Sequence, residues 1–304
     1  MASKTPIAAI EVITISMMAV CYGGLAFATM ILPQLSLVLA FVAVAVLVTL
    51  HSSLQHEALH GHPTRIEWIN EALVFPAVGL LIPYRRFKDL HLAHHHEEIL
   101  TDPYDDPESN YLDPAVWRNL PAFMKLVLRF NNTLCGRIIV GPMLSMIALI
   151  RDDFRASRKG DKTVILAWRL HTFGLLPVLF WLVAFGTMPL WLYGAAAYLG
   201  FGLLKIRTYL EHRAYEAHRG RTVIVADRGI LALLFLNNNF HVVHHNHPTE
   251  PWYRMRRLYD ANPEKYLSRN DGYFYPNYWA VFKAHFFKPK DPVAHPLWRG
   301  PKLR

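Results

Sequence analysis

The sequence predicts an all-α integral membrane protein, with four transmembrane helices in two hairpins and a cytoplasmic helical cap that carries three histidine-rich runs. Of its 304 residues, 53% are hydrophobic and only 18% are charged, whereas an ordinary globular domain carries about 25% charged residues. Hydrophobic stretches close to the roughly 20 residues that cross a bilayer occur in two pairs. No internal repeat is present, so we expect a single domain over residues 1–304.

The first pair of spans is predicted at about 7–32 and 35–52, separated by Pro33-Gln34. The segment Met1–Pro6 carries one charged side chain and no small-residue cleavage site follows it. We therefore predict a retained first span and not a signal peptide. The second span runs directly into the first histidine run, which places that run where the helix emerges from the bilayer.

Residues 53–163 are predicted to form the first part of the cap. The apolar stretch Glu71–Pro83 is too short to cross a bilayer and indicates an interfacial or re-entrant segment. Pro121–Ile150 is amphipathic and interrupted by polar residues, which favours helices lying along the membrane interface. Arg151–Lys162 is strongly charged and is expected on the cytoplasmic side.

The second pair of spans is predicted at about 164–185 and 189–207, joined by the short uncharged turn Gly186–Met188. Since basic residues mark cytoplasmic loops, this turn belongs outside and both termini belong in the cytoplasm. The rest of the cap, residues 208–304, includes an apolar helix from about Gly229 to Leu236 that leads into the third histidine run.

Three runs of histidines predict a metal site. They are His56-Glu57-Ala58-Leu59-His60, His91-Leu92-Ala93-His94-His95 and His241-Val242-Val243-His244-His245. On a helix, histidines three or four residues apart share one face, so each run can present two or three nitrogens to one point. Eight imidazoles exceed the three or four protein ligands of one zinc ion and suit two ions of higher coordination, of which iron is a redox-active choice.

The spelling of these runs, their order and their place around two hydrophobic hairpins resemble the membrane fatty acid desaturase family, which also holds acyl hydroxylases and carotenoid ketolases. The resemblance covers roughly His51 to Trp252 and implies a non-haem di-iron centre that uses O2 to attack an unactivated C–H bond. The first run, H-x-x-x-H, resembles that of acyl-lipid desaturases and carotenoid ketolases and not the longer run of acyl-CoA desaturases. The ligands that it implies are His56, His60, His91, His94, His95, His241, His244 and His245, with His212 as a ninth.

Further polar residues are weaker candidates. His62 and His96 adjoin the runs and are possible outer-sphere donors, and Asn238 and Asn239 are possible holders of a water near the metal; the role of His247 stays open. Acids that can orient ligand rings by accepting the distal N–H are Asp89, Glu97, Glu98, Asp102 and Glu211. His51, His171, His218, His285 and His295 lack the metal-binding spacing and are expected to be structural.

The resemblance implies desaturation of a lipid acyl chain with two external electrons, the alternative being hydroxylation or ketolation of a lipid or carotenoid at the same site. The sequence has no cytochrome b5 signature and no iron–sulfur cysteines, so a separate donor of the ferredoxin or cytochrome b5 type is expected. Two rivals belong to other classes. His56–His60 is also an H-E-x-x-H zinc protease motif, and a histidine-lined metal transporter would place its ligands near the bilayer midplane.

The net charge of +9 is expected to mark cytoplasmic loops and not a nucleic-acid partner. The two cysteines, Cys21 and Cys135, lie far apart, which suits a reducing compartment and predicts no disulfide framework. The expected location is the bacterial inner membrane, with the histidine runs on the cytoplasmic side.

Overall fold

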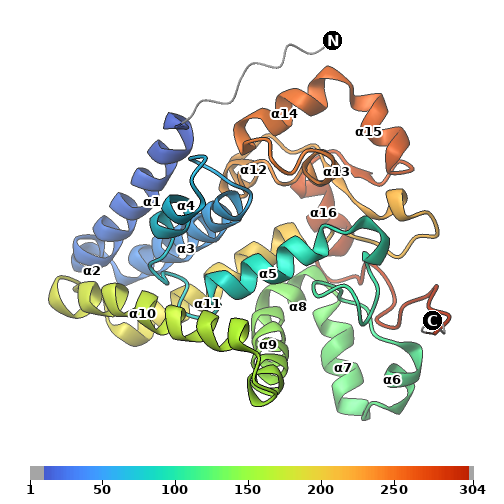
Figure 1. Cartoon of the computed structure of the whole chain (residues 1–304), viewed down its shortest axis with the longest axis horizontal. Coiled ribbons are helices and arrows are strands. Elements are labelled where there is room, and N and C mark those ends of the chain that lie inside the picture. The colour runs from blue at the N-terminus through green and yellow to red at the C-terminus, as the bar shows by residue number, and fades with distance from the viewer. Residues whose placement is uncertain (1–9, 301–304) are drawn as a thin grey trace.

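The computed structural model describes residues 10–300, with the side chain of Glu97 left out. The predicted beginning of the first span, residues 7–9, and the segment Met1–Pro6 therefore lie outside the described residues. The described chain is mostly helical, with 65% of its residues in helices and 3% in strands. Figure 1 shows the long helices on one side of the molecule and the short C-terminal helices on the other. Both cysteines are free thiols.

The first predicted hairpin is formed by α1 (Val12–Met30), the single turn α2 (Leu32–Leu35) and α3 (Leu37–Leu59). Pro33 stands in the first turn of α2, where its missing N–H costs nothing. Ser36 then caps α3 by accepting a hydrogen bond of 3.3 Å from the Leu39 backbone N–H. Because α3 continues to Leu59, the first histidine run lies on the candidate spanning helix itself, with His60 as the residue that ends it.

The second histidine run ends α5 (Tyr84–His94), which follows the short α4 (Glu67–Leu73). Between these helices the predicted interfacial stretch is mostly turns and not helix. The turns are held by contacts to the second hairpin: the Ala77 backbone N–H donates to the Gly174 carbonyl at 2.9 Å, and the Tyr193 hydroxyl donates to the Val78 carbonyl at 2.9 Å. The turns therefore return the chain to the end of α3.

Three helices cover the predicted amphipathic region: α7 (Ala122–Asn131), α8 (Leu134–Ile139) and α9 (Gly141–Arg158), and the short α6 (Pro114–Asn119) precedes it. One stripe of α9 exposes large apolar side chains at helical spacing, namely Met143, Ile147, Ile150 and Phe154. A stripe of this kind on a helix with charged residues elsewhere is typical of a helix lying at a membrane interface.

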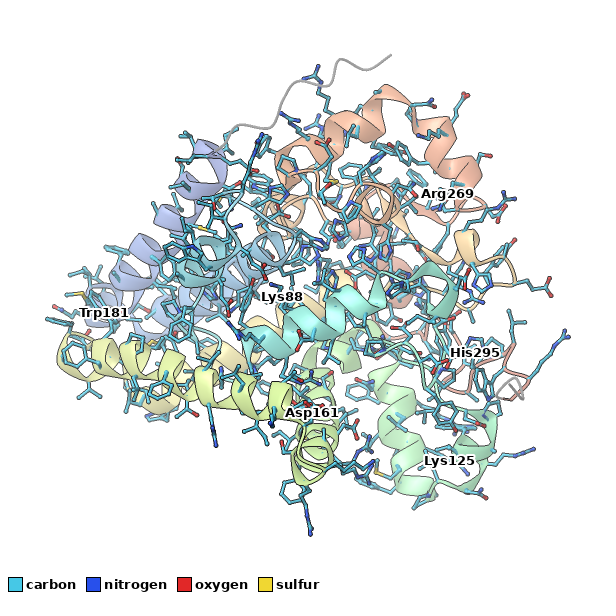
Figure 2. The ribbon with its side chains drawn as sticks, viewed as in Figure 1. Lys88, Lys125, Asp161, Trp181, Arg269 and His295 are labelled. Atoms are coloured by element: carbon cyan, nitrogen blue, oxygen red, sulfur yellow. The ribbon has the colours of Figure 1, made fainter. Side chains whose placement is uncertain are left out.

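The second predicted hairpin is formed by α10 (Lys162–Ala184) and α11 (Leu190–Thr208). Asp161 caps α10 by accepting the Thr163 backbone N–H at 3.0 Å, and Trp181 lies near the other end of that helix (Figure 2). Among the described residues, three helices are long and apolar enough to cross a membrane: Val12–Leu35, Leu37–Leu59 and Lys162–Ala184. The fourth predicted span, 189–207, is not among them; its helix contains tryptophan, tyrosine and glycine residues as well as Lys205 and Arg207, and is less hydrophobic than the other three.

α11 packs along α3 in the centre of the long-helix bundle. A Cβ atom at Gly200 would lie 2.8 Å from the Ala45 carbonyl oxygen, so glycine allows the two backbones to approach closely. The Thr49 hydroxyl donates to the Gly200 carbonyl at 2.9 Å across the same contact. This contact fixes the end of α3, with the first histidine run, against the end of α11, which precedes His212.

The C-terminal part consists of short elements grouped beside the end of α3 (Figure 1). In order they are η2 (His218–Arg221), β1 (Ile224–Val225), α12 (Ile230–Leu234), α13 (His241–Asn246), α14 (Trp252–Ala261), α15 (Pro263–Arg269), β2 (Phe274–Tyr275) and α16 (Tyr278–His285). One further short helix, η1 (Glu97–Ile99), lies earlier in the chain, after α5. The two-residue strands pair in parallel and form a small departure from an all-α fold. The third histidine run occupies α13.

Candidate metal centre

Nine histidines from distant parts of the chain meet in two adjoining groups. Cluster one contains His56, His60, His91 and His244, together with His95, whose Nε2 lies 3.0 Å from His91 Nε2 and 3.2 Å from His244 Nε2. Cluster two contains His94, His212, His241 and His245. In cluster two, and in cluster one without His95, the four candidate ligand atoms lie within 4.8 Å of one another.

Helical spacing explains how the second and third runs are divided. On α5, His91 and His95 stand four residues apart and face cluster one, while His94 faces cluster two. On α13 the pattern is reversed, because His241 and His245 face cluster two and His244 faces cluster one. The expectation that each run serves one point therefore needs refinement: histidines four residues apart stay together, and the one between them serves the other cluster.

The ring nitrogens of cluster two point at one another. His94 Nε2 lies 2.8 Å from His212 Nε2, which lies 3.3 Å from His241 Nε2. His245 Nε2 lies 3.2 Å from His241 Nε2. The structure thus places His212, on the short segment after α11, in the middle of this cluster.

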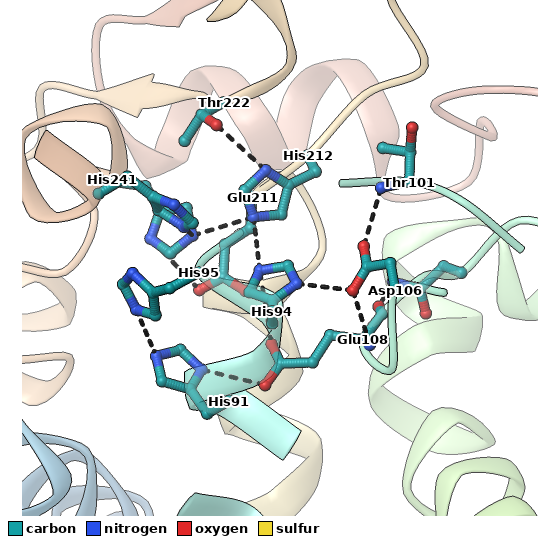
Figure 3. A network of polar contacts seen from close by, with 12 residues as sticks. His91, His94, His95, Thr101, Asp106, Glu108, Glu211, His212, Thr222 and His241 are labelled. Carbon is teal, nitrogen blue, oxygen red and sulfur yellow. Dashed lines mark hydrogen bonds and ion pairs between the residues drawn. The ribbon is translucent and has the colours of Figure 1, made fainter. Parts of the chain in front are cut away.

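Carboxylates stand behind the rings (Figure 3). His94 Nδ1 donates to Asp106 Oδ1 at 2.7 Å, and His91 Nδ1 donates to Glu108 Oε1 at 3.0 Å. Asp106 is held in turn by the backbone N–H groups of Thr101 and Glu108, at 2.8 and 2.9 Å. Partners of this kind fix a ring's tautomer and orientation and make its other nitrogen a better metal ligand.

Two neutral side chains hold further rings of these clusters. The Thr222 hydroxyl lies 3.2 Å from His212 Nδ1. Asn238 Oδ1 accepts from His241 Nδ1 at 3.0 Å, and its amide nitrogen lies 3.3 Å from His56 Nε2. Asn238 therefore contacts one histidine of each cluster.

The electrostatics of the two clusters differ. Burial first, and then neighbouring imidazoles, hold the pKa values of His241, His244 and His245 well below the usual range, so these rings are neutral. Burial likewise lowers the pKa of His95 to about 3. Burial also acts to lower the pKa of His94, but the carboxylates of Glu108 and Asp106 outweigh it and raise that pKa to about 9. Anions that stabilise an imidazolium also stabilise a metal cation.

The donor set fits metal ions. Because His91 and His94 donate through Nδ1 to carboxylates, Nε2 is the nitrogen through which each ring would bind a metal, and in His94 this requires the loss of one proton. The two Nε2 atoms face other ring nitrogens at about hydrogen-bond distance. The buried His60 Nε2 has no hydrogen-bond partner among the described residues. Nitrogen ligands about 2.1 Å from a metal and at right angles to each other lie about 3.0 Å apart, which is the separation of His91 Nε2 from His56 Nε2.

Other candidates lie outside the two clusters. His62 Nδ1 contacts the Glu11 carboxylate at 2.5 Å, His96 is exposed, and the amide of Asn239 donates to the Val225 carbonyl at 2.7 Å. His247 lies 3.3 Å from the Tyr266 hydroxyl. Four histidines without metal-binding spacing have partners of their own. His51 contacts Tyr22, His171 contacts the Leu80 carbonyl, His285 contacts Tyr275 and His295 contacts Thr101.

The carboxylates behind the rings are mostly not the ones the sequence suggested. Asp89 lies 3.7 Å from Arg86, Asp102 caps a turn by accepting the Tyr104 backbone N–H, Glu98 is exposed, and the Glu97 side chain lies outside the described residues. Only Glu211 is close, 3.8 Å from His241 Nδ1. Asp106 and Glu108 were missed; the signal was their place on either side of Pro107, in a rigid acidic loop shortly after the second run.

Glu57 also has a structural partner. Its Oε2 accepts the Trp252 backbone N–H at 3.1 Å, which ties the end of α3 to the beginning of α14. A general base of a zinc protease must instead contact the water on the metal.

The comparisons with known proteins agree with this geometry. A family model described as "Fatty acid desaturase" matches residues 32–277, which is most of the chain and includes all nine histidines. No curated protein matches the sequence.

Proposed function

Because the chain belongs to the fatty acid desaturase family, we propose that it is a membrane-bound oxidoreductase that binds one iron ion in each histidine cluster and desaturates a lipid acyl chain. The observation that carries the proposal is the meeting of nine imidazoles from three helices and one loop in two adjoining groups. Members of the family generally use a di-iron centre. The proposed ligands are His56, His60, His91, His95 and His244 for one ion and His94, His212, His241 and His245 for the other.

The bound ions would supply the reductive activation of O2 and the removal of hydrogen from a methylene group. The protein contributes neutral rings whose orientation is set by Asp106, Glu108 and Asn238. It also contributes burial: His91, His94, His241 and His244 are each at most 3% exposed. A water-excluded centre protects an oxidising reaction from side reactions with solvent.

The two electrons that each turnover requires would come from a separate donor of the ferredoxin or cytochrome b5 type. Both cysteines are free, and Cys21 is buried in α1, so neither belongs to an iron–sulfur site among the described residues. The net charge of +9 supports attraction to an acidic carrier protein.

For the membrane arrangement we propose four spans, with both termini and the histidine clusters on the cytoplasmic side of a bacterial inner membrane. Three candidate spans and the adjacent α11 support the two hairpins. The connection from α9 to α10 carries the basic residues Arg155, Arg158, Lys159 and Lys162. Basic connections of this kind remain in the cytoplasm.

The test is mass spectrometry of total lipids from cells that express the chain under 18O2. A lipid lighter by two hydrogens and free of label would identify a desaturase. Incorporated label would identify the alternative, a hydroxylase or ketolase that uses the same centre. The control is His244→Ala, which removes a proposed ligand, with His285→Ala as a histidine variant outside the clusters. If His244→Ala cells made the same product, the di-iron assignment would be wrong.

A second experiment separates this function from the zinc protease alternative. Glu57→Gln removes the carboxylate that a protease needs as general base, while its amide oxygen can still accept the Trp252 N–H. We expect this variant to keep its iron and most of its O2-dependent activity. A protein that contains zinc and hydrolyses peptides, and whose Glu57→Gln variant loses that hydrolysis while it keeps the zinc, would favour the protease.

A further inference from the structure

A cavity of about 520 Å³ lies beside cluster two, within the range of about 300–1,000 Å³ that is usual for ligand sites. His94 and His212 form part of its wall. Another part is apolar and comes from three helices, through Phe87 and Leu90 of α5, Met146 and Leu149 of α9, and Phe201 and Leu204 of α11. The cavity therefore joins the proposed metal centre to an apolar slot beside the interfacial helix α9.

One end of the cavity carries two cations without an acidic partner. Arg137 is only 4% exposed, and its guanidinium donates to the Asn131 carbonyl at 3.0 Å and to the Asn110 side chain. Lys205 Nζ donates to the Ser145 hydroxyl at 2.9 Å. Within residues 10–300, neither side chain forms an ion pair with a carboxylate.

The other cations that line the cavity are paired. Arg86 binds Asp153 at 2.8 Å, Arg207 Nε lies 3.3 Å from Glu211 Oε1, and Lys290 lies 3.5 Å from Asp291. The lack of a partner is therefore specific to Arg137 and Lys205. These two charges repel each other, and the Glu108 and Glu211 carboxylates, which also line the cavity, attract Lys205 without forming an ion pair with it.

Like charges in a partly desolvated cavity are costly unless an anion accompanies them. A guanidinium and an ammonium together suit an oxyanion, since both form charge-assisted hydrogen bonds to carboxylate or phosphate oxygens. We infer that the cavity binds an amphiphile whose carboxylate or phosphate group is held by Arg137 and Lys205, with its acyl chain on the apolar wall. This inference rests on the proposed function and defines the substrate class of the same centre.

The position of attack follows from this arrangement. The Lys290 backbone N–H donates to the Asn132 carbonyl, next to the Asn131 carbonyl that accepts from Arg137, and the Lys290 ammonium donates to the carbonyl oxygen of His212. The cationic end of the cavity therefore adjoins cluster two. A substrate anchored there presents carbons near its anionic group to the metal centre. The oxidised position lies close to the polar end of the chain and not at its middle.

The test measures binding without turnover, by native mass spectrometry of the metal-loaded protein in detergent. Three probes with the same 16-carbon chain are compared: palmitate, a monoacyl phosphatidylglycerol and the neutral monopalmitoylglycerol. We expect at least one anionic probe to bind about tenfold or more tightly than the neutral one. Preference for palmitate assigns a free carboxylate as the recognised group, and preference for the phospholipid assigns a headgroup phosphate.

Two variants of one residue identify the site. Lys205→Met should remove most of the preference for the anionic probe while the neutral probe binds as before, and Lys205→Arg should retain the preference. Lys159→Met, which removes an exposed lysine from the end of α9, is the matched control and should change nothing. Equal binding of anionic and neutral probes by the unmodified protein, or full preference in Lys205→Met, would overturn the inference.

Iron content and product analysis separate this outcome from failure of the proposed function. Protein that desaturates a lipid without preferring anionic probes would overturn the inference alone. Protein that prefers anionic probes but contains no iron would overturn the proposed function alone. With both intact, fragmentation of the product should place the new double bond nearer the polar end than the chain midpoint.

Discussion

The two histidine clusters differ in what surrounds them. Cluster one has five rings, lies between α3, α5 and α13, and has two carboxylates within 4 Å of its rings, Glu108 at His91 and Glu57 at His56. Cluster two has four rings, three carboxylates within 4 Å of its rings, and a wall in common with the cavity. Under the proposed function, the two clusters have separate duties: cluster one is enclosed by the helix bundle, and cluster two adjoins the cavity proposed to bind the substrate.

The largest expected effect comes from removing one ring from each cluster. His60→Ala takes a ring from cluster one and His212→Ala takes one from cluster two. We expect both variants to lose O2-dependent activity, and each to lose a different one of two iron signals in Mössbauer spectra. His285→Ala should keep both signals. Identical spectra for the two ligand variants would show that the clusters do not bind separate ions.

The next largest effect is expected from the carboxylates, whose removal should lower metal affinity differently at the two clusters. Asp106→Asn removes the charge behind His94 and should weaken metal binding at cluster two by about 10- to 100-fold. Glu108→Gln should weaken both sites, because Glu108 bonds His91 at 3.0 Å and lies 3.8 Å from His94. Asp102→Asn, a change in the same loop, serves as control. Metal titration of the apoprotein measures all three, and equal losses at both sites in Asp106→Asn would contradict the assignment.

The pH dependence of metal uptake should also separate the clusters. Without metal, burial lowers the pKa of His94, but the carboxylates of Glu108 and Asp106 outweigh this effect and the pKa is about 9. Burial lowers the pKa of His95 to about 3. Below about pH 9 a metal must therefore displace a proton from His94 but none from His95. Affinity at cluster two should rise by about tenfold per pH unit from pH 7 and level off near pH 9, whereas affinity at cluster one stays flat.

The smallest expected effect concerns a neutral contact. Thr222→Val keeps the shape of the side chain and removes the hydroxyl that lies 3.2 Å from His212 Nδ1. We expect metal affinity at cluster two to fall by about fivefold, the usual value of one neutral hydrogen bond. Thr187→Val, in the turn between α10 and α11, removes a hydroxyl that donates to the Met30 carbonyl and is the matched change. If Thr222→Val lowered the metal affinity of cluster two as much as Asp106→Asn does, the charge of Asp106 would not explain the affinity of that cluster.

Much of the helical arrangement follows from composition and periodicity. The hydropathy of residues 12–59 and 162–184 predicts helices that the structure contains, and Pro33 marks the break between the first two. The stretch 74–83 is an exception: it is apolar because it packs against α10 and α11, and not because it is helical. Hydropathy cannot distinguish burial against protein from burial in lipid.

The ligand set is local in sequence, but the division into clusters is not. Spacing shows that His91, His94 and His95 share a helix, yet which ring serves which ion depends on the angle between α5 and α13. The same limit applies to Asp106 and Glu108, since the loop that carries them lies near α5 only through tertiary contacts, such as that of Thr101 with His295. Only after the chain has folded do these acids differ from solvated ones.

The division of α13 between the two clusters has a consequence for how such a chain can change over generations. One extra residue inside this helix would turn everything after it by about 100°, moving His244 and His245 away from both centres in a single event. The walls of the cavity, drawn from α5, α9 and α11, have no such constraint. Lineages derived from this protein can therefore acquire new substrates by substitution in the cavity, while a change in the length of α13 destroys both centres.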